Sequence, residues 1–336
     1  MKTPGLVTIM VPVLNGELFL PLALESLLAQ DYSQFEVVIL DNQSTDRTAE
    51  ICREYAHRDM RVKYVLDTVN RISHDAANHL ATFITGEFCM IACDDDLWEP
   101  NFLGAMVRYL QCHPDVGLVF SNACYVDVQG NRGTQRLLAG RHLYRKEDSA
   151  FRNVWRYLGQ RRVVPTIFGV YRSEAYLAAL PFDTFDETIA DVDNLFLIKL
   201  FTLTAVQGID EVLFYYRNKF RGFDPSNGKR WSSSWALHAR HQWKFLQKIL
   251  NVVDHSQLSG FERFLLRIRS CYTFVAAVSL LRVRSNLGKI LVRLNIREGP
   301  STMKDVHTEI RSSALQAAHG DAKGVGNVGT SLKRSN

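Results

Sequence analysis

The sequence predicts an α/β protein in which a mainly parallel sheet is flanked by helices and followed by a C-terminal helical extension. Two observations carry this prediction. In the first 125 residues, short apolar runs rich in β-branched residues alternate with helical segments, which is typical of parallel strands joined by right-handed crossovers. From residue 231 onward, only helical periodicity is present.

Five buried strands are predicted in the first part, because each is a short apolar run closed by turn residues. They span residues 6–13, 35–40, 62–66, 88–92 and 116–120. Helices are predicted between them, where apolar residues recur three and four positions apart. These helices span residues 20–30, 48–55, 74–84 and 101–111.

The rest of the chain predicts fewer elements. A strand is expected at 165–172, a helix at 173–180, a late strand at 212–217, and two long helices at 238–250 and 261–281. After residue 299 the chain is rich in Gly, Ser, Ala and Lys with few large apolar residues, which is typical of disorder. We therefore expect three parts, which are a domain at 1–225, a helical extension at 226–298 and a disordered tail at 299–336.

The composition is that of an ordinary globular protein. With 46% apolar and 22% charged residues, it argues against disorder or a coiled coil for the bulk of the chain. The longest apolar stretch late in the chain is too short to span a bilayer, and the first residues do not resemble a secretory signal. The six cysteines form no CxxC pair and no zinc spacing, so we expect reduced thiols that mostly fill the core. These features predict a cytoplasmic protein.

The segment 261–297 is strongly basic. It contains eight Lys and Arg residues against one acid, Glu262. Basic residues beside apolar helical faces predict peripheral contact with the inner face of an anionic membrane. A packed helix with a solvated basic face explains the same pattern equally well. No nucleic-acid recognition motif accompanies the charge, so no nucleic-acid partner is expected.

Polar residues follow three of the predicted strands. Asn15 and Glu17 follow the first strand, Asp41 and Asn42 end the second, and the three aspartates 94–96 end the fourth. Ligands of parallel sheets bind at the carboxyl ends of the strands, where the crossover loops meet. Three adjacent carboxylates repel one another unless a cation neutralises them, and Mg²⁺ or Mn²⁺ bound there keeps places for phosphate oxygens. The sequence thus predicts a metal–diphosphate site, and the alternative is a solvated acidic turn before a helix.

Glycine-rich phosphate loops are absent from the turn after the first strand. That turn reads Pro-Val-Leu-Asn-Gly-Glu over residues 12–17, and it contains neither G-x-G-x-x-G nor G-x-x-x-x-G-K. The dehydrogenase and kinase classes therefore lose their main support. A nucleotidyltransferase would be expected to carry a glycine-rich loop with a basic residue after the first strand, and this loop is absent as well. If diphosphate binds here, a metal and side chains must hold it.

The order of these motifs resembles that of the family 2 glycosyltransferases, which have the Rossmann-like GT-A fold. Residues 7–15 (VTIMVPVLN) look like the family's opening strand and P-x-x-N turn, and residues 35–46 (FEVVILDNQSTD) look like its D-[DN]-x-S-x-D loop. Asn78, residues 85–88 (TGEF) and residues 93–100 (CDDDLWEP) resemble the segment that ends in its D-x-D-type metal motif. The match covers about residues 5–125 and continues more weakly to about 220.

The resemblance implies an enzyme of the hexosyltransferase type. It would move a sugar from a nucleotide-sugar donor, most commonly a UDP-sugar, to a glycan or lipid-linked acceptor with inversion, in polysaccharide biosynthesis for the cell envelope. A divalent metal, Mg²⁺ or Mn²⁺, would steady the diphosphate. Residues 1–125 would bind the donor, and residues 126–225 would face the acceptor.

The resemblance also assigns expected roles to individual residues. Asp41 would lie at the nucleobase, and the other donor-binding positions would be Pro12, Asn15, Glu17, Asn42, Asn78 and Asp94. Asp95 would be the direct metal ligand, with Asp94 beside it, either near the ribose or among the metal's ligands. Cys93 stands where many members carry the first Asp of the motif, so the register is open by one residue and Asp96 is a second candidate ligand.

A general base completes the implied mechanism, because inverting transfer needs a carboxylate to take the proton of the acceptor hydroxyl. In the family this base lies in an E-D-x-x-like motif that opens a helix. Asp191 fits that position best, with Ala190 in place of the usual Glu, and Asp193 is the alternative. Asp191 could also serve as the N-cap of the helix.

A non-catalytic relative of the same fold is the competing interpretation. Such a binding or scaffold protein would keep the sheet without turnover. Asn42, Cys93 and Ala190 depart from the family's motifs and favour this alternative, whereas the three aspartates 94–96 and Asp191 favour the enzyme.

Overall fold

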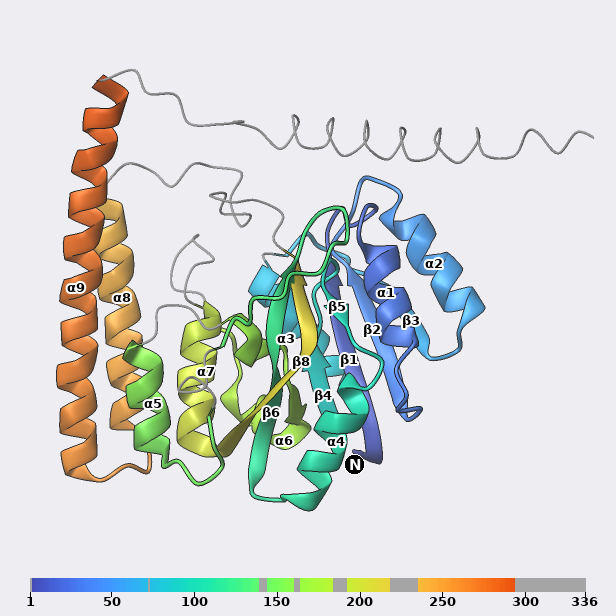
Figure 1. Cartoon of the computed structure of the whole chain (residues 1–336), viewed down its shortest axis with the longest axis horizontal. Coiled ribbons are helices and arrows are strands. Elements are labelled where there is room, and N and C mark those ends of the chain that lie inside the picture. The colour runs from blue at the N-terminus through green and yellow to red at the C-terminus, as the bar shows by residue number, and fades with distance from the viewer. Residues whose placement is uncertain are drawn as a thin grey trace, which may run out of the picture. The chain divides into compact units, whose positions relative to one another are not determined.

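The structure is a computed structural model that describes residues 2–71, 73–138, 144–159, 164–183, 192–217 and 235–293. Its strands form an eight-stranded sheet in the order β3-β2-β1-β4-β7-β6-β8-β5 (Figure 1). The strands are β1 (Thr3–Val13), β2 (Phe35–Asp41), β3 (Val62–Leu66), β4 (Gly86–Ile91), β5 (Leu97–Trp98), β6 (Val116–Val126), β7 (Val170–Arg172) and β8 (Ala205–Arg217).

Helices cover both faces of this sheet. The helices of the described residues are α1 (Leu20–Leu28), α2 (Thr48–Arg58), α3 (Ser73–Leu80), α4 (Phe102–Cys112), α5 (Ala150–Gly159), α6 (Ser173–Ala179), α7 (Val192–Leu203), α8 (Trp235–Asp254) and α9 (Gly260–Arg293). Within the described ranges, two short 3₁₀ helices, Ala81–Phe83 and Val164–Phe168, link longer elements. The alternation of strand and helix over the first 120 residues agrees with the sequence prediction.

Parallel pairing holds for the predicted strands of the first part. Strands β3, β2, β1 and β4 pair in parallel, and so do β6 and β8. The rest of the sheet is mixed, because β7 lies antiparallel between β4 and β6, and β5 lies antiparallel against β8. The predicted fifth strand therefore does not neighbour the fourth one. The register puts Val13, Asp41 and Leu66 side by side, so β1, β2 and β3 end at the same edge.

The central strands are mostly apolar, and both of their faces are buried. In β1, Val7, Ile9 and Val11 belong to one core cluster and Met10 to the other. Helices α1 and α4 pack into the first cluster, and α3, α6 and α7 pack into the second. A strand that is covered on both sides has no solvent-facing side. This explains why the sequence of these strands shows continuous apolar runs instead of alternating apolar and polar residues.

Two element predictions were wrong in part. Residues 165–172 were predicted as one strand, but Val164–Phe168 forms a 3₁₀ helix and the strand covers Val170–Arg172. Pro165 has no N–H to donate to a sheet, which accounts for the difference. The late strand was predicted at 212–217, but β8 begins at Ala205. Its middle residues Asp210 and Glu211 are exposed and hide the strand in the sequence.

The C-terminal helices do not stand apart from the sheet. The chain forms two compact units, of which the first comprises Met1–Gly222 with Ser232–Ser285, and the second comprises Phe223–Trp231 with Asn286–Asn336. Within the first unit, Ile249 and Val253 of α8 and Leu266 of α9 share one core cluster with Phe196 of α7. No helix in the described part of the chain is long and apolar enough to cross a membrane. The predicted tail at 299–336 lies outside the described residues.

The cysteines divide between core and surface. Cys52, Cys89 and Cys124 are buried, Cys93 is half-buried, and Cys112 and Cys271 are exposed. The prediction that they mostly fill the core therefore holds for three of the six.

Candidate active site

The turns that follow β1 and β2 are joined to each other by hydrogen bonds. The Asn15 N–H donates to Ser44 Oγ at 2.9 Å, and the Thr45 N–H donates to Asn15 Oδ1 at 2.8 Å. Asn15 has a left-handed backbone with φ of 56°, a conformation that Asn adopts more readily than most residues. The Arg47 N–H donates to Glu17 Oε2 at 3.2 Å. Two residues expected to line a donor pocket, Asn15 and Glu17, thus also hold these turns together.

Asp41 is fully buried at the end of β2. Its Oδ1 accepts from the Ser44 N–H at 2.8 Å, and its Oδ2 accepts from the Tyr64 hydroxyl at 3.0 Å. Burial and this hydrogen bond to a carboxylate raise the pKa of Tyr64 to about 12, so its hydroxyl remains a donor at neutral pH. Pro12 is half-buried on the neighbouring strand, where it is paired with Leu40.

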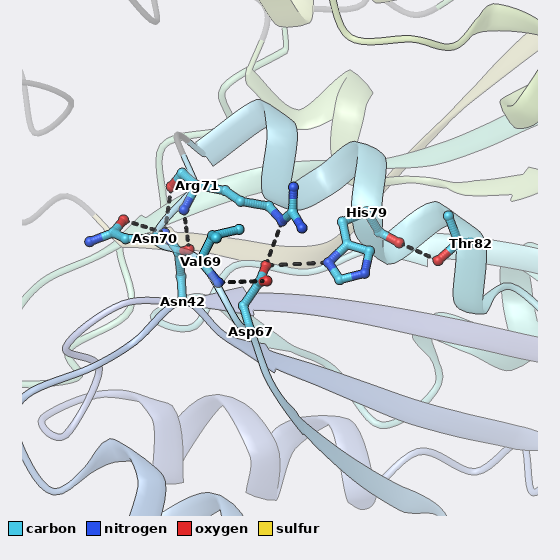
Figure 2. Close-up of polar contacts among 7 residues, drawn as sticks. All are labelled: Asn42, Asp67, Val69, Asn70, Arg71, His79 and Thr82. Carbon is cyan, nitrogen blue, oxygen red and sulfur yellow. Dashed lines mark hydrogen bonds and ion pairs between the residues drawn. The ribbon is translucent and has the colours of Figure 1, made fainter.

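Asn42 fixes the loop that follows β3, as Figure 2 shows. Its Nδ2 donates to Asn70 Oδ1 at 3.2 Å and to the Arg71 carbonyl at 2.5 Å, and its Oδ1 accepts from the Arg71 N–H at 2.6 Å. The side chain is buried. The amide at this position therefore accepts and donates at once, which a carboxylate could not do.

Asp67 is the charged centre of the same loop (Figure 2). Its buried carboxylate accepts from Arg71 Nε at 2.8 Å and lies 3.3 Å from His79 Nδ1 of α3. Burial alone would raise the pKa of Asp67, but the hydrogen bonds from Arg71 and His79 outweigh it and hold the pKa below its ordinary value. Arg71 is only partly buried, so Asp67 orients a cation at the edge where β1, β2 and β3 end.

The acidic loop after β4 lies against the first turn. A Cβ on Gly16 would come within 2.8 Å of Asp94 Oδ2, so glycine is needed for this close approach. One potential ligand atom each from Cys93, Asp95 and Asp96 lies within 4.8 Å of the other two. Carboxylate oxygens at this spacing fit a hard divalent cation. The two predicted metal ligands, Asp95 and Asp96, are therefore brought together, and Cys93 joins them.

Arg217, at the end of β8, organises this acidic loop. Its N–H donates to Asp96 Oδ1 at 2.7 Å and its Nε donates to the Asp95 carbonyl at 2.6 Å, while Nη1 donates to the Asp127 carbonyl. Its guanidinium lies over the ring of Phe19, 4.6 Å from the centroid. Burial lowers the pKa of Arg217, and the nearby aspartates oppose that shift.

Sequence reasoning missed this role of Arg217. This arginine is 2% exposed at the end of β8. A charged residue that ends a long apolar strand was the available signal, and the buried position of its partners could not be read from the sequence. Asp67 and Arg71 were missed for the same reason.

The remaining predicted residues lie elsewhere. Asn78 of α3 is joined to the main chain of Phe182, because its Nδ2 donates to the Phe182 carbonyl at 3.1 Å and its Oδ1 accepts from the Phe182 N–H at 2.8 Å. Its amide thus links α3 to the segment before α7. Asp193 is exposed in the first turn of α7. Asp191 lies outside the described residues.

Solved structures with the same fold are glycosyltransferases. S. aureus TarS, solved in complex with UDP-GlcNAc, has a TM-score of 0.62 at 19% identity, over 82% of this chain and 73% of that chain. The mannosyltransferase PcManGT from Pyrobaculum calidifontis, solved with GDP-Man and Mn²⁺, has a TM-score of 0.52 at 18% identity, over 93% of this chain and 80% of that chain. The fold is that of the GT-A class, as the sequence predicts.

Sequence comparison gives the family within that class. The family model described as glycosyl transferase family 2 matches residues 8–176, half of the chain, and the chain belongs to this family. WcaA of Escherichia coli K12, provisionally named a colanic acid biosynthesis glycosyl transferase, is 32% identical over 113 residues, 33% of this chain and 40% of WcaA. The chain spans about half the length, or less, of the curated relatives it matches.

Proposed function

We propose that the protein is an inverting glycosyltransferase that moves a sugar from a nucleotide-sugar donor to a glycan or lipid-linked acceptor. One observation carries this proposal. The acidic loop with Asp95 and Asp96 lies against the turn at Gly16, which is itself joined to the turn after Asp41. The candidate metal site and the candidate nucleobase pocket at Asp41 thus lie at one edge of the sheet. This edge is where α/β proteins bind nucleotides.

Asp95 and Asp96, together with Cys93, would hold the divalent metal, Mg²⁺ or Mn²⁺. Such an ion supplies charge neutralisation for a leaving diphosphate. Arg217 would keep the loop in the binding conformation through the Asp95 carbonyl and the Asp96 carboxylate. The Mn²⁺ in the structure of PcManGT supports a metal of this kind.

The donor would bind with its base near Asp41 and Pro12 and with its diphosphate toward Asp94. Asn15, Glu17, Asn42 and Asn78 would act indirectly, since their side chains hold the surrounding turns and segments in place. A UDP-sugar is the first donor to test, because TarS was solved with UDP-GlcNAc, and a GDP-sugar is the second because of GDP-Man in PcManGT.

Asp191 would be the general base, and Asp193 is the alternative two residues on. Exchanging each for Asn separates them once a donor is known. Loss of sugar transfer with unchanged nucleotide affinity is expected for Asp191→Asn, while Asp193→Asn should keep most of the activity. The reverse pattern would assign the base to Asp193.

The expected acceptor indicates where in the cell the enzyme works. The name of WcaA supports synthesis of a cell-envelope polysaccharide as the process. Because such acceptors are often carried on lipids, we place the enzyme at the inner face of the membrane by peripheral contact through the basic segment 261–297.

Calorimetric titration tests the donor site. UDP, GDP and dTDP are each titrated with and without Mn²⁺ into the wild type, Asp95→Asn and Asp115→Asn. Asp115 is an exposed aspartate in the turn before β6 and serves as the matched control. We expect one nucleotide to bind in a metal-dependent way, Asp95→Asn to abolish that binding, and Asp115→Asn to preserve it. A folded wild type that binds none of the three would contradict the transferase proposal.

A further inference from the structure

The solvent side of α9 carries a stripe of large apolar side chains. Its members are Phe261, Phe264, Ile268, Tyr272 and Val275, and each is between 51% and 70% exposed. They recur at spacings of three and four residues, so they lie on one face of the helix over about 20 Å. We call this set the α9 stripe.

The α9 stripe differs from the other exposed apolar residues. Elsewhere in the described residues they are scattered over separate loops and helices, as with Met60, Leu177 and Leu203. Single exposed apolar residues are normal on a protein surface, but a contiguous row of them marks a surface that meets a partner or a membrane.

Contacts on the opposite side of α9 fix its orientation. Leu266 and Ser270 are buried, Phe274 packs on Trp243 of α8 with centroids 5.8 Å apart, and the Arg269 guanidinium lies over Trp155 of α5. Figure 1 shows α9 (orange) running beside α8. A rotation of α9 that buried the stripe would break all of these contacts, so the stripe stays exposed in the folded chain.

Charge identifies the kind of surface that covers the α9 stripe. From residue 263 to residue 297 the chain carries eight Lys and Arg residues and no acid. Three of these cations, Arg263, Arg267 and Arg269, lie between Phe261 and Val275, and Arg267 is paired with Asp254 at 2.6 Å. A second copy of the chain would bring the same excess of positive charge and be repelled. Anionic lipid headgroups attract this charge, and the membrane interface accepts Phe, Tyr and Ile side chains.

We propose that the α9 stripe is a docking face for an anionic membrane surface, in which the apolar side chains enter the headgroup region and the basic residues bind acidic lipids. This refines the membrane contact proposed above. Its test measures binding and not sugar transfer, so the two proposals can fail separately.

Vesicle binding by the full chain tests this inference. The probes are vesicles of phosphatidylcholine alone and of phosphatidylcholine with phosphatidylglycerol in equal parts. We expect binding to the anionic vesicles and not to the neutral ones. Phe264→Glu with Ile268→Glu should weaken that binding about tenfold or more, because two inserted apolar groups are lost. The control, Met60→Glu with Leu203→Glu, changes two apolar residues elsewhere that are at least as exposed as Ile268, and it should bind like the wild type.

Two cysteines provide a second readout that does not depend on the stripe substitutions. Cys271 lies next to Tyr272, and Cys112 lies on α4, and both are exposed. An environment-sensitive fluorophore is attached to Cys271 in a Cys112→Ser protein, and to Cys112 in a Cys271→Ser protein. Anionic vesicles should shift the emission of the first label to the blue and leave the second unchanged.

Three results would overturn the proposal. The first is that the wild type does not bind anionic vesicles. The second is that the stripe variant binds as well as the wild type, which would mean that the basic residues act alone. The third is that the wild type is a dimer in solution and the stripe variant is a monomer. The last outcome would assign the α9 stripe to self-association.

Discussion

Arg217 is a buried cation that donates hydrogen bonds to one carboxylate oxygen and two main-chain carbonyl oxygens. Its backbone and side chain bind the Asp95 carbonyl, the Asp96 carboxylate and the Asp127 carbonyl, which belong to two different loops. A guanidinium can make these bonds at once because its donors point in several fixed directions. The conformation of the candidate metal loop therefore depends on a residue more than a hundred positions later in the sequence.

Replacing Arg217 with Lys keeps the positive charge but cannot reproduce bonds to both loops. We expect the free energy of unfolding to fall by about 1–3 kcal/mol and metal-dependent nucleotide affinity to fall about tenfold. Urea denaturation and calorimetry measure the two effects. Arg47→Lys, at an arginine with a 71% exposed side chain, is the control and should change neither. Unchanged nucleotide affinity in Arg217→Lys would mean that the loop keeps its conformation without the guanidinium.

If the proposed site binds a metal, Cys93 should change which divalent metal the site prefers. A thiolate is a softer ligand than a carboxylate, so it favours Mn²⁺ over Mg²⁺ relative to an all-oxygen site. We expect Cys93→Asp to lower the ratio of Mn²⁺-supported to Mg²⁺-supported nucleotide affinity about tenfold. Calorimetry with each metal measures the ratio, and Cys112→Asp on the surface is the control. An unchanged ratio would exclude Cys93 from the metal site.

Single residues differ in how well the sequence predicts them. The aspartates 94–96 were selected as candidates because adjacent carboxylates after a buried strand are chemically conspicuous. The amides of Asn15, Asn42 and Asn78 were predicted to be site residues, but their hydrogen-bond partners Thr45, Arg71 and Phe182 were not predicted. Those bonds link segments up to 104 residues apart, and an amide gives no sign in the sequence of which segment it will bind.

At the scale of elements, the loop between β3 and α3 depends on the carboxylate of Asp67. Arg71 from the loop and His79 from α3 both reach it, and its own N–H donates to the Asp41 carbonyl at 2.9 Å. The loop thereby joins β2, β3 and α3 at the edge that carries the candidate donor pocket.

Asp67→Asn removes this charge with little change in shape. We expect the free energy of unfolding at neutral pH to fall by about 1–3 kcal/mol, because Arg71 loses its charged acceptor and the contact with His79 Nδ1 loses its carboxylate. The pKa of Asp67 is lower in the folded chain than its ordinary value of 3.8. Its stabilisation is therefore complete above that value and is lost as the pH falls through the folded pKa.

Urea denaturation at neutral pH and at about pH 3 measures the effect of Asp67→Asn. The difference between wild type and variant should be smaller at the acidic pH. Asp115→Asn, at an exposed position, should differ from the wild type at neither pH. A difference of the same size at both pH values would show that the charge of Asp67 does not stabilise the loop.

Elements with a strong apolar pattern were predicted well, and those interrupted by polar residues were not. The five strands predicted in the first part correspond to β1, β2, β3, β4 and β6, and the four helices between them correspond to α1 to α4. The two-residue strand β5 was not predicted, and β6 continues six residues beyond its predicted end. Strand β8 was found only in its second half, because Asp210 and Glu211 interrupt it. Its pairing with β6 stabilises the whole strand, and that pairing involves residues about 90 positions away in the sequence.

At the scale of the whole molecule, the sheet and the C-terminal helices share a core. The sequence predicted a boundary near residue 225 because the family's motifs fade there. The structure instead groups α8 and the larger part of α9 with the sheet in one compact unit. A change of motif marks the end of a resemblance, but a domain boundary requires that few contacts cross it.

Leu266 of α9 tests whether this shared core unfolds as one. It is fully buried in the same cluster as Phe196 of α7 and Ile249 of α8. Leu266→Ala leaves a cavity, and we expect the free energy of unfolding to fall by about 2–5 kcal/mol. Far-UV and near-UV circular dichroism should then report a single coincident transition in urea, at a lower midpoint than in the wild type. Phe264→Ala, on the exposed side of the same helix, is the control and should change the free energy by less than about 0.5 kcal/mol. Separate transitions, with the helical signal lost first and the aromatic signal of the sheet unchanged, would mean that the helices fold as a domain of their own.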